Sequence, residues 1–147
     1  MSELEIREIK EMVGNTIIDY VLSDDEITFY MANNTKIRFY HSQDCCENVH
    51  IESIDGDLDD LVDKPLNIAE FVSSCLGYDD GNEILDGYEI SPIDDSTTWT
   101  FYKFATINGY VTIRFVGSSN GYYSESVDML VTDAIQECRD IKLKKIN

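Results

Sequence analysis

The fold is decided by the stretch TTWTFYKFATINGYVTIRFVGSSNGYYSESVDMLV, residues 97–131. Aromatic and β-branched residues dominate it, and both classes are enriched in strands. Asn108-Gly109 is the strongest short signal for a hairpin turn, and SSNG at 118–121 gives a second turn. The stretch therefore predicts a meander of three long antiparallel strands.

The preceding segments predict further strands and two helices. Strands are expected in TIIDYVL, in NVHIESI, and in EITFYMA and TKIRFYH, which Asn33-Asn34 joins as a hairpin. An amphipathic helix is expected over 2–14, and a central helix from Pro65 to Gly77. With a short C-terminal helix in 133–147, the sequence predicts one α+β domain over 1–147, built on an antiparallel sheet.

The chain is strongly acidic. It carries 29 Asp and Glu against 11 Lys and Arg, which gives a net charge of −18. Such a surface repels nucleic acid and membranes and attracts basic partners, although solubility alone is the alternative explanation. No apolar run approaches the roughly 20 residues that span a bilayer. The start, MSELEIREIK, lacks the apolar core of a signal peptide, so we expect a cytosolic protein.

The stretch HSQDCCENVH, residues 41–50, holds both histidines of the chain. If the chain turns back at its centre, His41 faces His50, and Cys45 and Cys46 lie at the tip. Two imidazoles with one or two thiolates form a ligand set that zinc favours. This arrangement predicts a structural zinc site. The fourth ligand would come from Asp44, Glu47 or Cys75.

Two other interpretations of 41–50 stay open. The residues could pack in a loop without metal, or a cysteine could act as a nucleophile with a histidine as its base. No glycine-rich turn flanks the cysteines to build an oxyanion hole, so a non-catalytic protein is expected. A bond between the adjacent Cys45 and Cys46 would be strained. Cys75 and Cys138 sit in apolar surroundings and are expected in the core.

Acidic clusters are the expected partner-binding residues. DGDLDD, from Asp55, resembles a calcium loop, but Asp60 stands where glycine is needed and Leu66 where glutamate is needed. A solvated acidic face that meets a basic partner is the better interpretation. Its candidate residues are Asp55, Asp57, Asp59, Asp60, Asp63, Asp79, Asp80, Glu83, Asp94 and Asp95.

Residues 39–61 and 97–128 resemble a family of small bacteriophage-encoded proteins of unknown function. The resemblance implies a phage origin and action in the cytoplasm of the infected bacterium. Small acidic phage proteins often inhibit host defence, and an anti-CRISPR protein that blocks a Cas nuclease is one case. Surface carboxylates would mimic phosphates and compete for the nuclease's basic groove, so that DNA is not loaded. The expected function is therefore that of a DNA-mimicking inhibitor, with zinc bracing its fold.

Two rival functions remain. The chain could sequester a small signalling nucleotide, with aromatic side chains on the base and Arg38 or Arg114 on the phosphate. Alternatively, it could be a small metal- or thiol-dependent enzyme that uses 41–50. In each case no direct contact with nucleic acid is expected.

Overall fold

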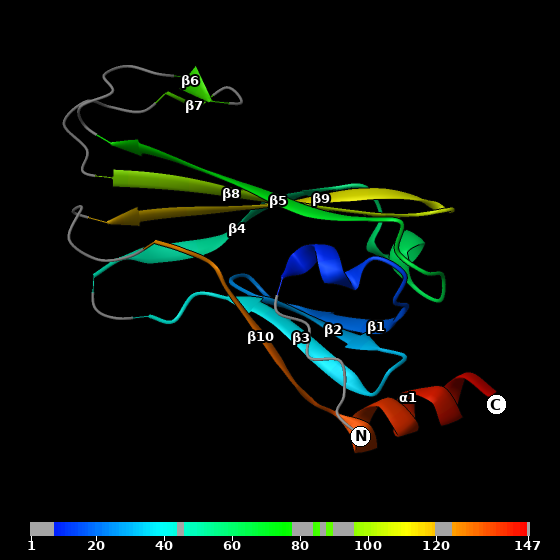
Figure 1. Ribbon diagram of the computed structural model, residues 1–147. Helices are drawn as coiled ribbons and strands as arrows, with labels where there is room; N and C mark the ends of the chain where they lie inside the picture. The colour runs from blue at the N-terminus through cyan, green and yellow to red at the C-terminus, as the bar shows by residue number, and fades with distance from the viewer. Residues whose placement is uncertain are drawn as a thin grey trace.

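Two four-stranded antiparallel sheets face each other across the core in the computed structural model (Figure 1). The structure describes residues 8–43, 46–77, 84–85, 88–89, 96–119 and 125–146. The first sheet has the order β1 (Ile17–Leu22), β2 (Ile27–Met31), β3 (Thr35–Tyr40) and β10 (Asp128–Asp133). The second has the order β4 (Asn48–Asp55), β9 (Gly109–Ser119), β8 (Ser96–Thr106) and β5 (Ile68–Gly77).

Short elements complete the described chain. They are the 3₁₀ turns η1 (Ile9–Met12) and η2 (Leu58–Leu61), the strand pair β6 (Ile84–Leu85) and β7 (Tyr88–Glu89), and the helix α1 (Ile135–Ile146). The turn η1 lies between the sheets, and α1 lies below the first sheet (Figure 1). No helix in the described part of the chain has the length and apolar character to cross a membrane.

The core is aromatic because alternate residues of the facing strands point inward. Phe29 lies edge-on to Phe104, with ring centroids 5.3 Å apart, and Phe39 lies 4.8 Å from Tyr102. All four side chains are at least 96% buried. Burying each of these rings contributes about 1.5–3 kcal/mol, so this cluster is a large part of what holds the sheets together.

Both hairpins with an asparagine turn are confirmed. β8 and β9 pair continuously from Ser96↔Ser119 to Thr106↔Gly109, so the two-residue turn is Ile107-Asn108, one residue before the predicted Asn108-Gly109. β2 and β3 pair around a three-residue connection, Ala32 to Asn34, one residue longer than the predicted Asn33-Asn34 turn, and Asn34 has φ 71°. Asparagine accepts this left-handed backbone more readily than most residues, which is the physical reason that the prediction succeeds.

The third strand of the predicted meander is wrong. β10 pairs with β3 in the first sheet, whereas β4 takes the position beside β9. Because β8 and β4 pair with the two sides of β9, the segment after β9 cannot pair with β9 as a meander requires. The strand therefore crosses over and completes the opposite sheet.

The α+β prediction is also wrong, because the described chain is mostly antiparallel sheet with α1 as its α-helix. The predicted central helix is the strand β5, which pairs with β8 over ten consecutive residues. Apolar residues lie on both faces of β5, so the sequence shows the apolar spacing of a helix and not the strict alternation of a strand. In the structure the side chains on the outer face are exposed, Ile68 by 42% and Val72 by 58%. Of the predicted N-terminal helix, the structure describes only η1, since residues 1–7 lie outside the described residues. The C-terminal helix is confirmed.

Candidate functional site

His41 is held in a buried network at the start of the connection between the sheets. Its Nδ1 lies 2.7 Å from the Ser126 carbonyl oxygen, and its Nε2 lies 2.7 Å from Oε2 of Glu47. The side chains of His41 and Glu47 are 5% and 0% exposed.

The two contacts define the proton state of His41. A carbonyl oxygen and a carboxylate both accept hydrogen bonds, so the ring donates from both nitrogens and is the imidazolium when Glu47 is ionised. Burial by itself lowers the pKa of His41, but the hydrogen bonds to Glu47 and Ser126 outweigh it, and the pKa is raised. The arrangement is a buried ion pair between His41 and Glu47, and His41 also binds the chain before β10 through Ser126.

The predicted hairpin between His41 and His50 is wrong. β3 and β4 belong to different sheets, so the chain crosses from one sheet to the other between them and the two strands do not form a hairpin. His50 lies on β4, where its Nδ1 is 3.2 Å from Oδ1 of Asn48. The physical reason is that β3 already has β2 and β10 on its two edges.

The predicted zinc ligands do not form a metal-binding set in the described residues. Both ring nitrogens of His41 face protein acceptors, and Cys46 is disulfide-bonded. The described residues contain no group of three or more His, Cys, Asp or Glu side chains that could hold a metal. Asp44 and Cys45 lie outside the described residues, as does the side chain of Cys75, so zinc stays a prediction.

The acidic segment 55–63 folds around η2 at one end of the sandwich. Asp57 caps η2 by accepting a hydrogen bond from the Asp59 backbone N–H, at 3.0 Å. The Tyr20 hydroxyl donates to Oδ1 of Asp59 at 2.8 Å. This hydrogen bond, with burial and the charges of Asp59, Asp57 and Asp19, raises the pKa of Tyr20 to about 12. Of these three carboxylates, Asp59 is the one that accepts the hydrogen bond of the Tyr20 hydroxyl.

The other predicted acids of this segment remain at the surface or brace it. Asp55 is exposed at the end of β4, and Asp63 accepts from Nζ of Lys145 at 2.6 Å. The Asp60 carbonyl accepts a hydrogen bond from the Thr106 hydroxyl. The remaining candidates, Asp79, Asp80, Glu83, Asp94 and Asp95, lie outside the described residues.

The two arginines considered for phosphate binding have contacts within the protein. Arg38 donates from Nε and Nη2 to Oε1 of Glu26, at 3.1 and 2.7 Å, and its guanidinium lies 3.9 Å from the centre of the Tyr40 ring. Arg114 lies over the Trp99 ring at 5.2 Å. A phosphate at Arg38 would have to compete with a carboxylate.

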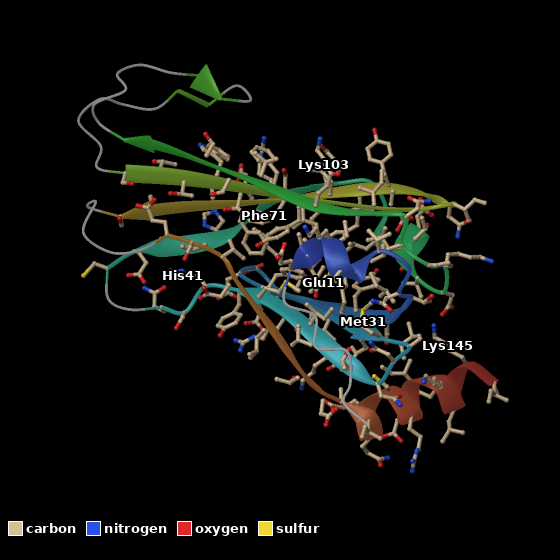
Figure 2. All side chains as sticks on the ribbon, viewed as in Figure 1. Glu11, Met31, His41, Phe71, Lys103 and Lys145 are labelled. Carbon is tan, nitrogen blue, oxygen red and sulfur yellow. The ribbon has the colours of Figure 1, made fainter. Side chains whose placement is uncertain are left out.

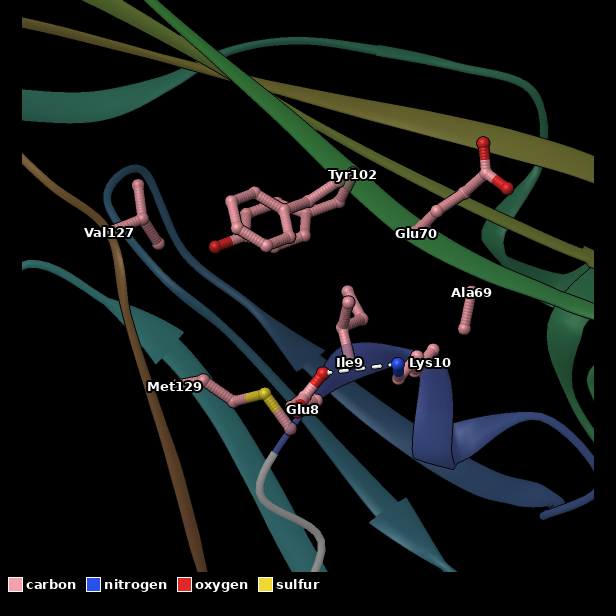
Figure 3. Close-up of a pocket in the computed structure, with 9 residues that line it drawn as sticks. Glu8, Ile9, Lys10, Ala69, Glu70, Tyr102, Val127 and Met129 are labelled. Carbon is pink, nitrogen blue, oxygen red and sulfur yellow. Dashed lines mark ion pairs between the residues drawn. The ribbon is translucent and has the colours of Figure 1, made fainter.

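A groove of about 420 Å³ opens between η1, β5 and the chain that leads into β10 (Figure 3). Tyr102 and Phe71 line one side, and Ile9, Val127 and Met129 line the other. Phe71 points from β5 toward the space between the sheets, whereas Lys103 points away from it (Figure 2). This groove could not be predicted from the sequence, because its lining comes from four separate segments.

Glu125 is a second buried carboxylate that sequence reasoning missed. It is 6% exposed and accepts hydrogen bonds from the hydroxyls of Ser96, Thr98 and Ser119. The hydroxyls reach it from β8 and β9, whose pairing places Ser96 opposite Ser119. Such a cage stabilises a charge that would be costly to bury alone.

Comparison with known proteins places the chain in a family. Residues 10–129 match the family described as a domain of unknown function, DUF7448, and the chain belongs to it. No curated protein and no solved structure matches significantly.

Proposed function

We propose that this protein is an acidic, non-catalytic binding protein that occupies a basic surface of another protein. The observation that carries the proposal is the acidic end, which we define as Asp19, Asp57, Asp59 and Asp63. All four are exposed; Asp57 and Asp59 belong to the capped turn η2, and the Asp63 backbone N–H donates to the Ile17 carbonyl. With a net charge of −18, this end favours rapid, salt-dependent association with Lys- and Arg-rich surfaces.

The finer proposal concerns the target. We propose that the protein is a phage-encoded inhibitor that acts in the cytoplasm of the infected bacterium and binds the basic DNA channel of a Cas nuclease. Carboxylates fixed at separate points can replace DNA phosphates on Lys and Arg side chains. The buried pair of His41 and Glu47 supports a structural rather than a catalytic role for 41–50, because both ring nitrogens are engaged.

The experiment is DNA displacement. Purified Cas nucleases of several types, each loaded with its guide RNA, are mixed with labelled target DNA and increasing amounts of the protein, and DNA binding is followed by fluorescence anisotropy. The proposal expects displacement from at least one nuclease, weakening steeply as salt rises. Binding to a nuclease without displacement would contradict the DNA-channel proposal. Absence of any complex with all nucleases tested would contradict the proposed target class.

A further inference from the structure

We propose that the free edge of β5, with the groove beside it, docks an extended segment of a partner protein that carries an apolar side chain between basic ones. The inference rests on the proposed function for the charge of the partner. It adds the surface and the backbone contacts that would hold that partner.

The first support is the edge itself. β5 is the last strand of its sheet and pairs with β8 over ten residues without a register shift. Among the described residues, no strand pairs with its other side. An edge strand presents unpaired N–H and C=O groups that can bind another strand.

The other sheet edges are shorter or interrupted. β1 and β4 have register shifts between Ile17 and Asp19 and between Ile51 and Ser53. Such irregularities twist an edge and hinder pairing. β10 has six residues, against ten for β5. In the described part of the chain, β5 therefore offers the longest regular edge.

The second support is the groove. Phe71 is 52% exposed and stacks on Tyr102, with ring centroids 5.7 Å apart and an interplanar angle of 29°. Ile9 and Met129 face these rings across a space of about 420 Å³ (Figure 3). This volume lies within the usual range for binding pockets and accommodates one long aliphatic or aromatic side chain. A strand added to β5 would direct alternate side chains toward this space.

Charge selects the occupant. Glu8 and Glu70 lie at the rim of the groove, and Glu8 pairs only at the surface, 3.5 Å from Lys10. Exposed pairs of this kind are weak and leave the carboxylate available to a second cation. A second copy of the chain also carries a net charge of −18, and repulsion between the like charges opposes self-association. A basic extended segment would instead be attracted to the acidic rim of the groove.

The experiment uses nine-residue labelled peptides in which Lys and Thr alternate around a central variable residue. Binding is measured by fluorescence anisotropy, with Ala, Leu or Phe at the centre. We expect the Leu or Phe peptide to bind about tenfold more tightly than the Ala peptide, because its side chain fills the groove. Two N-methylated versions of the best peptide then test strand pairing, each methylated on one alternate set of residues. Because only one set faces β5, one version should lose about tenfold in affinity and the other should stay within about twofold.

Variants of the protein locate the site. Phe71→Lys should weaken peptide binding about tenfold, because it adds a like charge to the peptide's own and removes a groove wall. Val21→Lys is the matched control, since Val21 is 57% exposed on the edge strand β1, and it should bind within about twofold of wild type. Phe71→Ala leaves the charge of the protein unchanged. It should reduce the protein's preference for peptides with a central Leu or Phe over the peptide with a central Ala, and it replaces Phe71→Lys if that variant unfolds.

Several results would overturn the inference. They are equal effects of the two N-methylated peptides, equal effects of Phe71→Lys and Val21→Lys, and no binding of any peptide. A wild-type dimer in sedimentation that Phe71→Lys dissociates would assign the edge to a second copy instead. If Phe71→Lys still displaces DNA from a nuclease as well as wild type does, the proposed function stands and this inference fails. If the peptides bind at β5 but the protein displaces DNA from no nuclease, this inference stands and the proposed function fails.

Discussion

At the scale of single residues, the pair of His41 and Glu47 has the clearest energetic consequence. Removing one member of a buried ion pair leaves the other charge without compensation, which typically costs about 3 kcal/mol. We expect His41→Ala to lower the free energy of unfolding by about this amount in urea titrations. His50→Ala is the control, because the hydrogen bond between His50 and the Asn48 side chain is exposed and its loss should change stability by less than about 0.5 kcal/mol. If the two substitutions lowered the free energy of unfolding equally, the buried pair of His41 and Glu47 would not stabilise the protein as described.

The same pair predicts how stability depends on pH. The pKa of His41 is raised in the folded state above its usual value of 6.5. The stabilisation is therefore fully present below pH 6.5 and is lost as the pH rises through the folded-state pKa. Urea titrations across this range should show wild type approaching His41→Ala in stability as the pH increases. If the difference in free energy of unfolding between wild type and His41→Ala grew as the pH rises, the pKa of His41 would be lowered in the folded state and not raised.

Cys138 should be an inert thiol. It is 0% exposed and free, and its Sγ donates to the Met31 carbonyl at 3.4 Å. Burial raises the pKa of this thiol, so little thiolate forms near neutral pH. Alkylation followed by peptide mass spectrometry should find Cys138 unmodified in the native protein and modified after unfolding. Rapid native labelling would mean that α1 does not pack as described.

At the scale of elements, Gly117 controls how closely β9 approaches its neighbours. A Cβ atom there would lie 2.9 Å from the Glu125 Cβ and 2.9 Å from the Val49 Cγ2. Gly117→Ala should therefore destabilise the protein by about 1–3 kcal/mol, through overpacking. Ser118→Ala, at the adjacent exposed position, should be nearly neutral in the same thermal or urea unfolding experiment. A neutral Gly117→Ala would mean that the segment carrying Glu125 can move away.

The helix α1 modulates the acidic end. Nζ of Lys145 lies 2.6 Å from Oδ1 of Asp63, and both side chains are more than one-third exposed. Exposed ion pairs are worth at most about 1 kcal/mol, so a basic partner can compete with Lys145 for this carboxylate. Lys145→Ala should strengthen the protein's binding to a nuclease from which it displaces DNA, by about two- to threefold at low salt. Weaker binding would place α1 in the contact surface itself.

Local signals predicted the elements better than their partners. The hairpins predicted from Asn33-Asn34 and Asn108-Gly109 were correct because turn chemistry acts within a few residues, although each turn begins one residue earlier than predicted. The sheet assignment of β10 and the predicted hairpin between His41 and His50 were wrong, because the edge that a strand joins depends on contacts far apart in sequence. β5 was mistaken for a helix because a half-exposed edge strand does not need clean alternation. Glu47 was considered only as a metal ligand, and its buried pairing with His41 depends on the crossing that the hairpin prediction excluded.

At the scale of the whole molecule, charge placement decides the proposed function. The acidic end comes from η2 and β1, which the fold brings together, whereas the net charge of −18 is spread over the chain. If only net charge matters, neutralising any three carboxylates should weaken DNA displacement equally. If the acidic end is the contact surface, neutralising three of its carboxylates should weaken displacement more than neutralising three others.

The most direct test compares two charge-matched triple variants in the DNA displacement assay. One is Asp57→Asn, Asp59→Asn and Asp63→Asn, and the other is Asp24→Asn, Asp25→Asn and Asp133→Asn, three exposed carboxylates elsewhere. The account predicts that the first triple weakens displacement at least about tenfold at low salt, and that the second stays within about threefold of wild type. Equal losses in the two triples would contradict a defined acidic contact surface and leave only a general charge effect.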